Sequence, residues 1–220
     1  MQKSSYRYII LIIVAVLLVS TVIGFERSRD NEGTENVEIE GLVIEEIPKI
    51  DNERPEDYRT STFAVWCFWA PEARVGVVDG VISTRVGFIE VDGSVRDDRR
   101  IVREAIQVDY DPDKITYMEL YNIIQETGEI KDMHPFGVFK LAPWNRQNYY
   151  LRGHENLTEA YQSVYPHWGD FINSTATSRI NGYLIGFGQL GSPEDLQHLG
   201  LTEKGREEVY EIWESERKMR

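Results

Sequence analysis

Residues 62–91 read TFAVWCFWAPEARVGVVDGVISTRVGFIEV. The stretch opens with TFAVWCF (62–68), whose β-branched and aromatic residues are typical of a strand. Pro71 suits the first turn of a helix because its missing N–H needs no partner there, and we expect a helix over 71–80. VISTRVGFIEV (81–91) predicts a second strand. The stretch therefore predicts a strand–helix–strand unit with the only cysteine of the chain at its first junction.

The segment after this unit adds a strand and a helix. IVREAIQVDY (101–110) predicts a third strand. Thr116 and Glu119 make a capping box that opens a helix over 116–127, and Gly128 is expected to stop it. The order strand–helix–strand–strand–helix predicts an α+β fold, a two-layer ferredoxin-like sandwich in which helices pack on a mixed sheet.

The N-terminal region predicts a membrane anchor. Residues 8–25, YIILIIVAVLLVSTVIGF, carry no charge and are long enough to span a bilayer as a helix. Lys3 and Arg7 precede this run and an acidic segment follows it, so the positive-inside rule puts residues 1–7 in the cytoplasm. We expect a single-pass protein of the cell membrane whose main domain faces outside the cytoplasm. The alternative is a cleaved signal peptide, for which LVSTVIG could serve as the cleavage region.

Composition and net charge limit the domain organisation and the kinds of ligand that we expect for the rest of the chain. Residues 26–58 are rich in Asp and Glu and predict an acidic linker, which leaves 59–220 as the compact domain. The net charge of −13 argues against binding to nucleic acid, which needs clustered Lys and Arg. The four histidines lack the close pairing of a metal site, so we expect neither a metal nor a cofactor.

Cys67 is the first candidate for chemistry. At a strand-to-helix junction it would meet the free N–H groups and positive potential of a helix N-terminus, which favour the nucleophilic thiolate. Phe68 and Trp69 would build an apolar wall able to hold a methyl or thioether group. The alternative is plain packing, because a free cysteine is among the most buried residue types.

Glu104 is the second candidate. Side chains alternate along a strand, so Glu104 shares one face with Val102, Ile106, Val108 and Tyr110. A carboxyl group in an apolar environment is suited to act as a general acid. The alternative is a salt bridge to one of three nearby arginines: Arg96, Arg99 or Arg100.

These residues resemble those of a known family. WCFWAPEARVGVVDGVISTRVGF (66–88) is similar to the signature of the A-type peptide methionine sulfoxide reductases, in which Gly-Cys-Phe-Trp is followed by Glu and a Val-x-Gly-Tyr strand. REAIQVDYDP (103–112) is similar to a second motif and places Glu104 on the catalytic acid of the family. APWNRQNYYLR (142–152) is a degraded form of a third motif, and SRINGYLIGFG (178–188) resembles the Asn-Gly-Tyr tail of many members.

The resemblance implies an activity and roles for residues. The implied reaction is thiol-dependent reduction of methionine S-sulfoxide, in which Cys67 attacks sulfur, Glu104 donates a proton and Cys67 becomes a sulfenic acid. Phe68, Trp69 and Phe88 are the implied substrate-binding residues. With no second cysteine in the chain, an external thiol or a thioredoxin-like reductant would regenerate Cys67. The implied substrates are oxidised methionine peptides or proteins.

Two departures from the family pattern affect the expected site. Trp66 stands where the family has glycine, and Phe88 replaces an oxygen-binding tyrosine. The segment that carries a second tyrosine in the family has no counterpart. Two other functions therefore stay open: a binding domain on the same fold that recognises a methionine-like or peptide ligand, and a cell-surface interaction domain in which Cys67 is buried packing.

Overall fold

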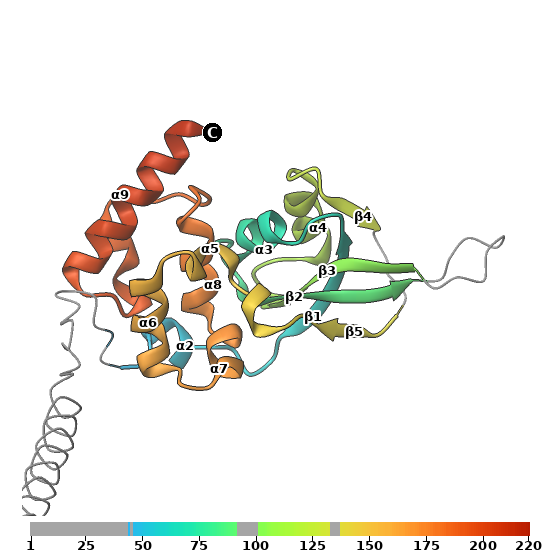
Figure 1. Cartoon of the computed structure of the whole chain (residues 1–220), viewed down its shortest axis with the longest axis horizontal. Coiled ribbons are helices and arrows are strands. Elements are labelled where there is room, and N and C mark those ends of the chain that lie inside the picture. The colour runs from blue at the N-terminus through green and yellow to red at the C-terminus, as the bar shows by residue number, and fades with distance from the viewer. Residues whose placement is uncertain (1–43, 45, 92–100, 133–136) are drawn as a thin grey trace, which may run out of the picture. The chain divides into compact units, whose positions relative to one another are not determined.

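Five strands and a group of helices make up the part of the chain that the structure, a computed structural model, describes: residues 44, 46–91, 101–132 and 137–220 (Figure 1). The strands are β1 (Arg59–Val65), β2 (Val81–Val91), β3 (Ile101–Tyr110), β4 (Ile130–Asp132) and β5 (Phe139–Leu141). They form one sheet in the order β4-β1-β3-β2-β5, and each neighbouring pair is antiparallel.

The α+β prediction is confirmed, but the expectation of a mixed sheet is wrong. The chain runs β1–α3–β2–β3–α4–β4, with α3 at Trp69–Gly76 and α4 at Tyr117–Gln125, which is the ferredoxin-like order. Each helical connection joins two strands that have a third strand between them in the sheet: β3 lies between β1 and β2, and β1 lies between β3 and β4. Parallel strands are therefore never adjacent, and β5 extends the antiparallel pattern at the β2 edge.

Most element limits agree with the sequence patterns. β2 and β3 span the predicted residues, and the Thr116–Glu119 capping box is present at the start of α4. The first strand spans Arg59–Val65 and so begins and ends earlier than the predicted 62–68; the N–H of Trp66, which follows it, bonds the carbonyl of Glu129. The first helix begins at Trp69, earlier than predicted, which still leaves the proline in its first turn.

Helices α3 and α4 cover one face of the sheet and enclose a core. Buried side chains from the strands, among them Phe63 and Ile106, meet Val75 of α3 and Leu120 of α4 in this core. Glu104 lies on the same face of β3 as Ile106, as the alternation predicted. This core supports the junction between β1 and α3 from beneath.

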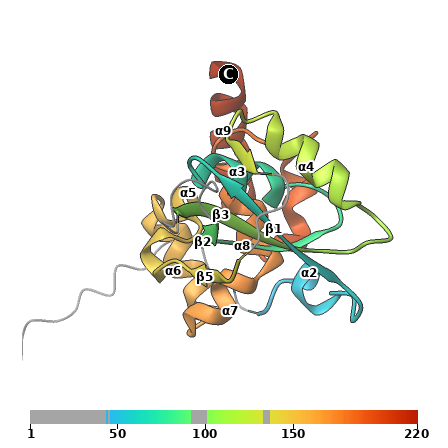
Figure 2. The same ribbon diagram turned by 90° about the vertical axis from the view of Figure 1, so that its right-hand side faces the viewer.

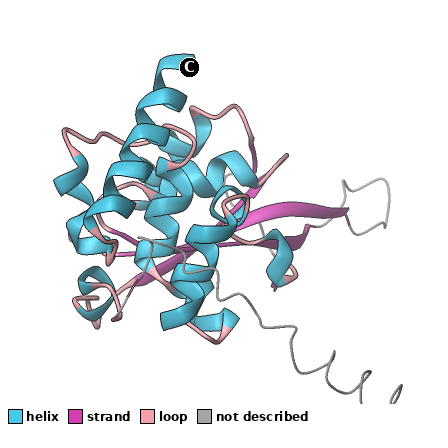
Figure 3. Ribbon diagram, turned by 60° about the vertical axis from the view of Figure 1, so that its left-hand side comes forward, coloured by secondary structure: helices cyan, strands magenta, loops and turns pink. Residues whose placement is uncertain are grey.

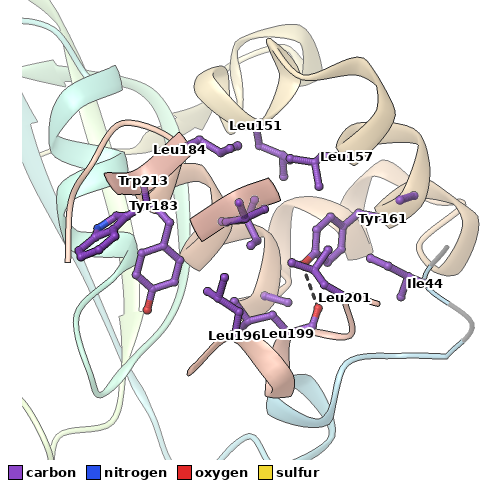
Figure 4. Packing of buried hydrophobic residues seen from close by; sticks show 14 of the residues in the cluster. Ile44, Leu151, Leu157, Tyr161, Tyr183, Leu184, Leu196, Leu199, Leu201 and Trp213 are labelled. Carbon is purple, nitrogen blue, oxygen red and sulfur yellow. Dashed lines mark hydrogen bonds between the residues drawn. The ribbon is translucent and has the colours of Figure 1, made fainter. Parts of the chain in front are cut away.

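The remaining helices of the described residues form a second group beside the sheet (Figures 1–3). It contains α2 (Lys49–Asn52), η1 (Trp144–Arg146), α5 (Tyr149–Arg152), α6 (Glu155–Val164), α7 (Trp168–Asn173), α8 (Thr175–Tyr183), η2 (Pro193–Leu199) and α9 (Glu203–Met219). Its own apolar core includes Leu157, Tyr161 and Trp213 (Figure 4). The buried Tyr161 hydroxyl donates to the carbonyl of Leu199 at 2.8 Å, which ties α6 to η2.

Two glycines join the sheet part to the helical group. A Cβ atom added at Gly76 of α3 would lie 2.5 Å from the carbonyl oxygen of Ser178 in α8. One added at Gly182 of α8 would lie 2.3 Å from the carbonyl oxygen of Ala73 in α3. The backbones of α3 and α8 therefore touch, and only glycine fits at these two positions.

The end of the expected acidic linker, 26–58, is part of this compact unit. Ile44 is buried in the helical core. Asp51 of α2 accepts hydrogen bonds from the hydroxyls of Tyr165 and Ser174 and from the N–H of Thr175, the first residue of α8. The structured domain therefore begins before residue 59.

The predicted membrane span, residues 8–25, lies outside the described residues. Among the helices that the structure does describe, none is both long enough and apolar enough to cross a membrane.

Removing the Asp51 carboxylate should destabilise the domain. Asp51→Ala leaves the Tyr165 hydroxyl and the first N–H of α8 without their acceptor, which typically costs about 1–3 kcal/mol. Urea denaturation measures the loss. Asp57→Ala, at an exposed position, is the matched control and should leave the midpoint unchanged. Equal midpoints for both variants would contradict the role of Asp51.

Candidate functional site

Cys67 lies in the short turn between β1 and α3 and is partly exposed. Its N–H donates to the carboxylate of Glu129 at 2.9 Å, and the N–H of Trp66 donates to the carbonyl of Glu129 at 2.8 Å. The loop that follows α4 therefore holds the backbone of the cysteine. This placement agrees with the predicted junction and excludes deep burial of the thiol residue.

Glu104 reaches the same turn from the sheet. It pairs with Val65 on β1 and with Phe88 on β2, and its side chain accepts the N–H of Phe68 at 3.1 Å. The carboxyl group therefore lies against the residue that follows Cys67. The three arginines proposed as alternative partners fall outside the described residues.

The aromatic residues around Cys67 have different exposures. Phe68 is buried, with 1% of its surface exposed, and its ring meets those of Trp69 and Phe88 edge to face at 6.0 and 6.1 Å. Trp69 and Phe88 are only partly buried and are therefore the rings that a ligand can reach. Trp66 is 58% exposed, with the Arg103 guanidinium 5.9 Å from its ring centroid.

A segment from the helical group completes the site. The side-chain carboxamide of Gln147 bonds β2 in the way that the backbone of a neighbouring strand would. It accepts the N–H of Val86 and donates to the carbonyls of Val86 and Ala142, all at 2.8–2.9 Å. This pins the chain to β2 just before α5. The ring of Tyr149, the first residue of α5, then stacks on Trp69 with centroids 4.0 Å apart.

The N-terminus of α5 is held by two side chains from other helices. Glu72 of α3 accepts the N–H groups of Asn148 and Tyr149. Asn181 of α8 accepts the N–H groups of Tyr150 and Leu151 at 2.9 and 3.1 Å. The first turn of a helix leaves such donors free, and here all four are satisfied. We name Glu72 and Asn181 the α5 cradle.

Glu72 is fully buried, and burial raises the pKa of its carboxyl to about 8. The two backbone hydrogen bonds oppose that shift only in part. Its second oxygen, Oε2, has no hydrogen-bond partner among the described residues. A neutral carboxyl is therefore the stable form near pH 7, since an ion buried without a cation is costly.

Tyr150, the second residue of α5, is partly buried. Its pKa is raised, mainly by burial and next by the charge of Cys67. Glu129 and the α5 cradle were not predicted from the sequence as site residues. The available signals were an acid in the otherwise mostly apolar run of α3 and an asparagine in the buried helix α8. Neither signal indicates a partner, because both partners are distant in sequence.

The fold and the site define a class: a ferredoxin-like α+β domain with one accessible cysteine, a carboxyl beside it and an aromatic surround. Comparison with known proteins assigns that class more closely. Residues 59–138 match the family model described as peptide methionine sulfoxide reductase. The resemblance found in the sequence is thus confirmed, and this segment is related to that family.

Individual relatives agree with the family match. Over 69 residues the chain is 36% identical to "Peptide methionine sulfoxide reductase MsrA" of Thermoactinomyces vulgaris, covering 29% of this chain and 56% of the relative. It is 32% identical to the Drosophila melanogaster reductase over 72 residues, 32% of this chain and 29% of the relative. The MsrA of Methanococcoides burtonii is 37% identical over 75 residues, 30% and 48% respectively. The chain therefore spans about half or less of these relatives.

The stability of the domain should depend on pH through Glu72. Between its ordinary pKa of 4.5 and about 8, the unfolded chain is ionised while the folded protein keeps the proton. The contribution of Glu72 to the free energy of unfolding is therefore fully present below pH 4.5. It is lost as the pH rises from 4.5 towards about 8, and the free energy of unfolding falls by up to about 1.4 kcal/mol per pH unit. Glu72→Gln keeps an oxygen acceptor for the cradle but cannot ionise, so it should flatten this slope.

Urea unfolding at several pH values over roughly pH 5 to pH 8 measures the slope. Glu211→Gln, an exposed change on α9, is the control and should keep the wild-type slope. A wild-type slope in Glu72→Gln would show that Glu72 does not hold its proton.

Proposed function

We propose that this chain is a peptide-methionine (S)-S-oxide reductase, which uses thiols to reduce methionine S-sulfoxide, free or in peptides and proteins. The observation that carries the proposal is the carboxyl of Glu104 bound 3.1 Å from the N–H of Phe68, directly beside Cys67. A nucleophile and a proton donor thus meet at one turn, inside the segment that matches the reductase family.

The proposed first step forms a bond between the two sulfur atoms. The Cys67 thiolate attacks the sulfoxide sulfur while Glu104, protonated, gives its proton to the sulfoxide oxygen. The sulfur–oxygen bond of the substrate then breaks as the OH group passes to Cys67, and the sulfur–sulfur bond breaks with its electron pair staying on the substrate sulfur. The products are methionine and a Cys67 sulfenic acid; the substrate sulfur is reduced and the cysteine sulfur is oxidised by two electrons.

The second step regenerates the thiol. Two external thiols, or one dithiol protein of the thioredoxin kind, reduce the sulfenic acid to Cys67 with release of water and a disulfide. An external reductant is required because the chain has no second cysteine. The partial exposure of Cys67 supports direct access by such a partner.

The aromatic rings supply the proposed contacts to substrate. Trp69 and Phe88 are partly exposed, each has its ring against that of Phe68, and the two would hold the S-methyl group. Phe68 lies in the core and supports these two rings from behind. Burial of a methyl group against such rings stabilises binding through the hydrophobic effect.

We also propose that residues 8–25 anchor the protein in the cell membrane with the domain outside the cytoplasm. The support is the uncharged apolar run preceded by Lys3 and Arg7. The full chain should pellet with membranes and resist extraction by alkaline carbonate, whereas a variant lacking residues 1–25 should not. Digestion of the domain by protease added to intact cells tests its orientation.

Turnover of a methionine S-sulfoxide substrate with dithiothreitol tests the reaction. Cys67→Ser should abolish turnover because a hydroxyl is a far weaker nucleophile. Glu104→Gln should lower kcat by about 10²- to 10⁴-fold, the usual share of general acid catalysis. Near-normal rates in Glu104→Gln would remove that residue from the mechanism.

The same assay separates the reductase from a binding domain on the same fold. If wild type and Cys67→Ser both fail to turn over substrate but bind methionine sulfoxide peptides equally, the chain is a binding domain. If Cys67 of the native protein also resists alkylation by iodoacetamide, the thiol belongs to the packing.

A further inference from the structure

A small hollow lies at the end of the sheet away from Cys67, where four segments of the domain meet. It has a volume of about 80 Å³ and is lined by α2 with the residues just after it, the turn before β2, the turn after β3 and the start of α8. Val81, the first residue of β2, lines it, whereas Phe88 of the candidate site lies seven residues further along the same strand. At about 3.3 Å per residue the hollow is therefore roughly 20 Å from the candidate site.

A buried, unpaired arginine reaches this hollow. Arg179 of α8 is one of the lining residues, and only 6% of its surface is exposed. Its guanidinium makes no hydrogen bond or ion pair with any residue that the structure describes. Burial lowers the pKa of this group, and the charges of Tyr183 and Asp79 oppose that shift only in part. Because a buried cation without a partner is costly, an anion bound in the hollow would stabilise the folded protein.

Acidic side chains also line the hollow, but two of them have other cations as partners. Asp79 pairs with Lys114 at 3.9 Å, and Glu53 pairs with Lys49 at 3.6 Å. Both carboxylates are largely exposed to water. Neither one forms an ion pair with Arg179, so the charge of the arginine is left for a ligand.

The lining favours an anion that carries a single charge and a short apolar tail. Glu53, Asp79 and Asp111 surround the same hollow and would repel a second negative charge, which disfavours phosphate and sulfate. Ile50 and Ile82 supply apolar surface. Since one water-sized group needs roughly 10–15 Å³, the hollow holds on the order of six such groups, which is the size of a short carboxylic acid.

We propose that Arg179 binds a small aliphatic monocarboxylate, of the size of acetate or propionate, in this hollow. The planar guanidinium donates two parallel hydrogen bonds to the carboxylate, and the aliphatic carbons lie against the isoleucines. Arg54, an exposed residue of the same lining, adds positive charge at the rim. The hydroxyl of Thr175 is already bonded to the carbonyl of Ile82 at 2.6 Å, so recognition of the charge falls to the arginines. The site does not depend on the proposed reductase function, because it is remote from Cys67.

Thermal unfolding of the full chain in a carboxylate-free buffer at constant ionic strength tests the binding. A ligand that binds only the folded state raises Tm as its concentration increases. Sodium propionate should raise Tm to a degree that saturates, whereas propionamide, an uncharged analogue of the same shape, should leave Tm unchanged. No rise with propionate, or an equal rise with propionamide, would overturn the proposal. A larger rise with phosphate than with propionate would overturn the assignment to a monocarboxylate.

A pair of matched variants tests the arginine. Arg179→Met keeps most of the length and the apolar stem of the side chain but removes the charge. It should weaken propionate binding roughly 10- to 100-fold, the usual effect of losing hydrogen bonds to a charged group. Arg146→Met, at an exposed position outside the hollow, is the control and should respond to propionate like wild type. An unchanged response in Arg179→Met would show that propionate binds elsewhere.

A second measurement needs no ligand. Without propionate, the wild-type protein carries a buried cation that has no partner, so Arg179→Met should have a urea midpoint equal to or above that of wild type. A midpoint clearly below that of wild type would show that the chain itself satisfies the guanidinium, and the inference would fail.

Discussion

The close contact between α3 and α8 is the constraint on which the site depends. Gly76 and Gly182 let the two backbones touch, and a Cβ at either position would meet a carbonyl oxygen at 2.5 Å or less. Glu72 lies one turn before Gly76 on α3, and Asn181 directly precedes Gly182 on α8. The contact therefore brings the two members of the α5 cradle together, so that one short helix can be held by two others.

Carboxyl groups organise the surroundings of the thiol. Glu129 and Glu104 each take one backbone N–H at the turn that carries Cys67, and Glu72 takes two more at the start of α5. Each of these hydrogen bonds fixes the position of a backbone N–H, either at the turn that carries Cys67 or at the start of α5. Glu72 is completely buried, and this burial favours the protonated form of its carboxyl group. The burial that lets Glu72 hold α5 in place therefore lowers the stability of the folded protein at high pH.

One part of the site lies inside the segment that matches the reductase family, another part lies outside that segment, and each depends on the other. Cys67, Glu104 and Phe88 fall within the matched segment, residues 59–138, while Tyr150 and Asn181 come from the helical group beyond it. Gln147 links the two parts by imitating a strand on the edge of β2.

Local patterns in the sequence predicted three of the strands, two of the helices and the two central residues, Cys67 and Glu104. Alternation placed Glu104 on the apolar face of β3, the capping box marked the start of α4, and the junction position of Cys67 followed from the strand and Pro71. These features are local, because each depends on the spacing of residues within one element. Tertiary structure alone decided that β1 ends at Val65, that parallel strands never become neighbours, and that Glu129 and Asn181 reach the site. Each of these depends on hydrogen bonds or backbone contacts between residues far apart in the chain, which no local pattern encodes.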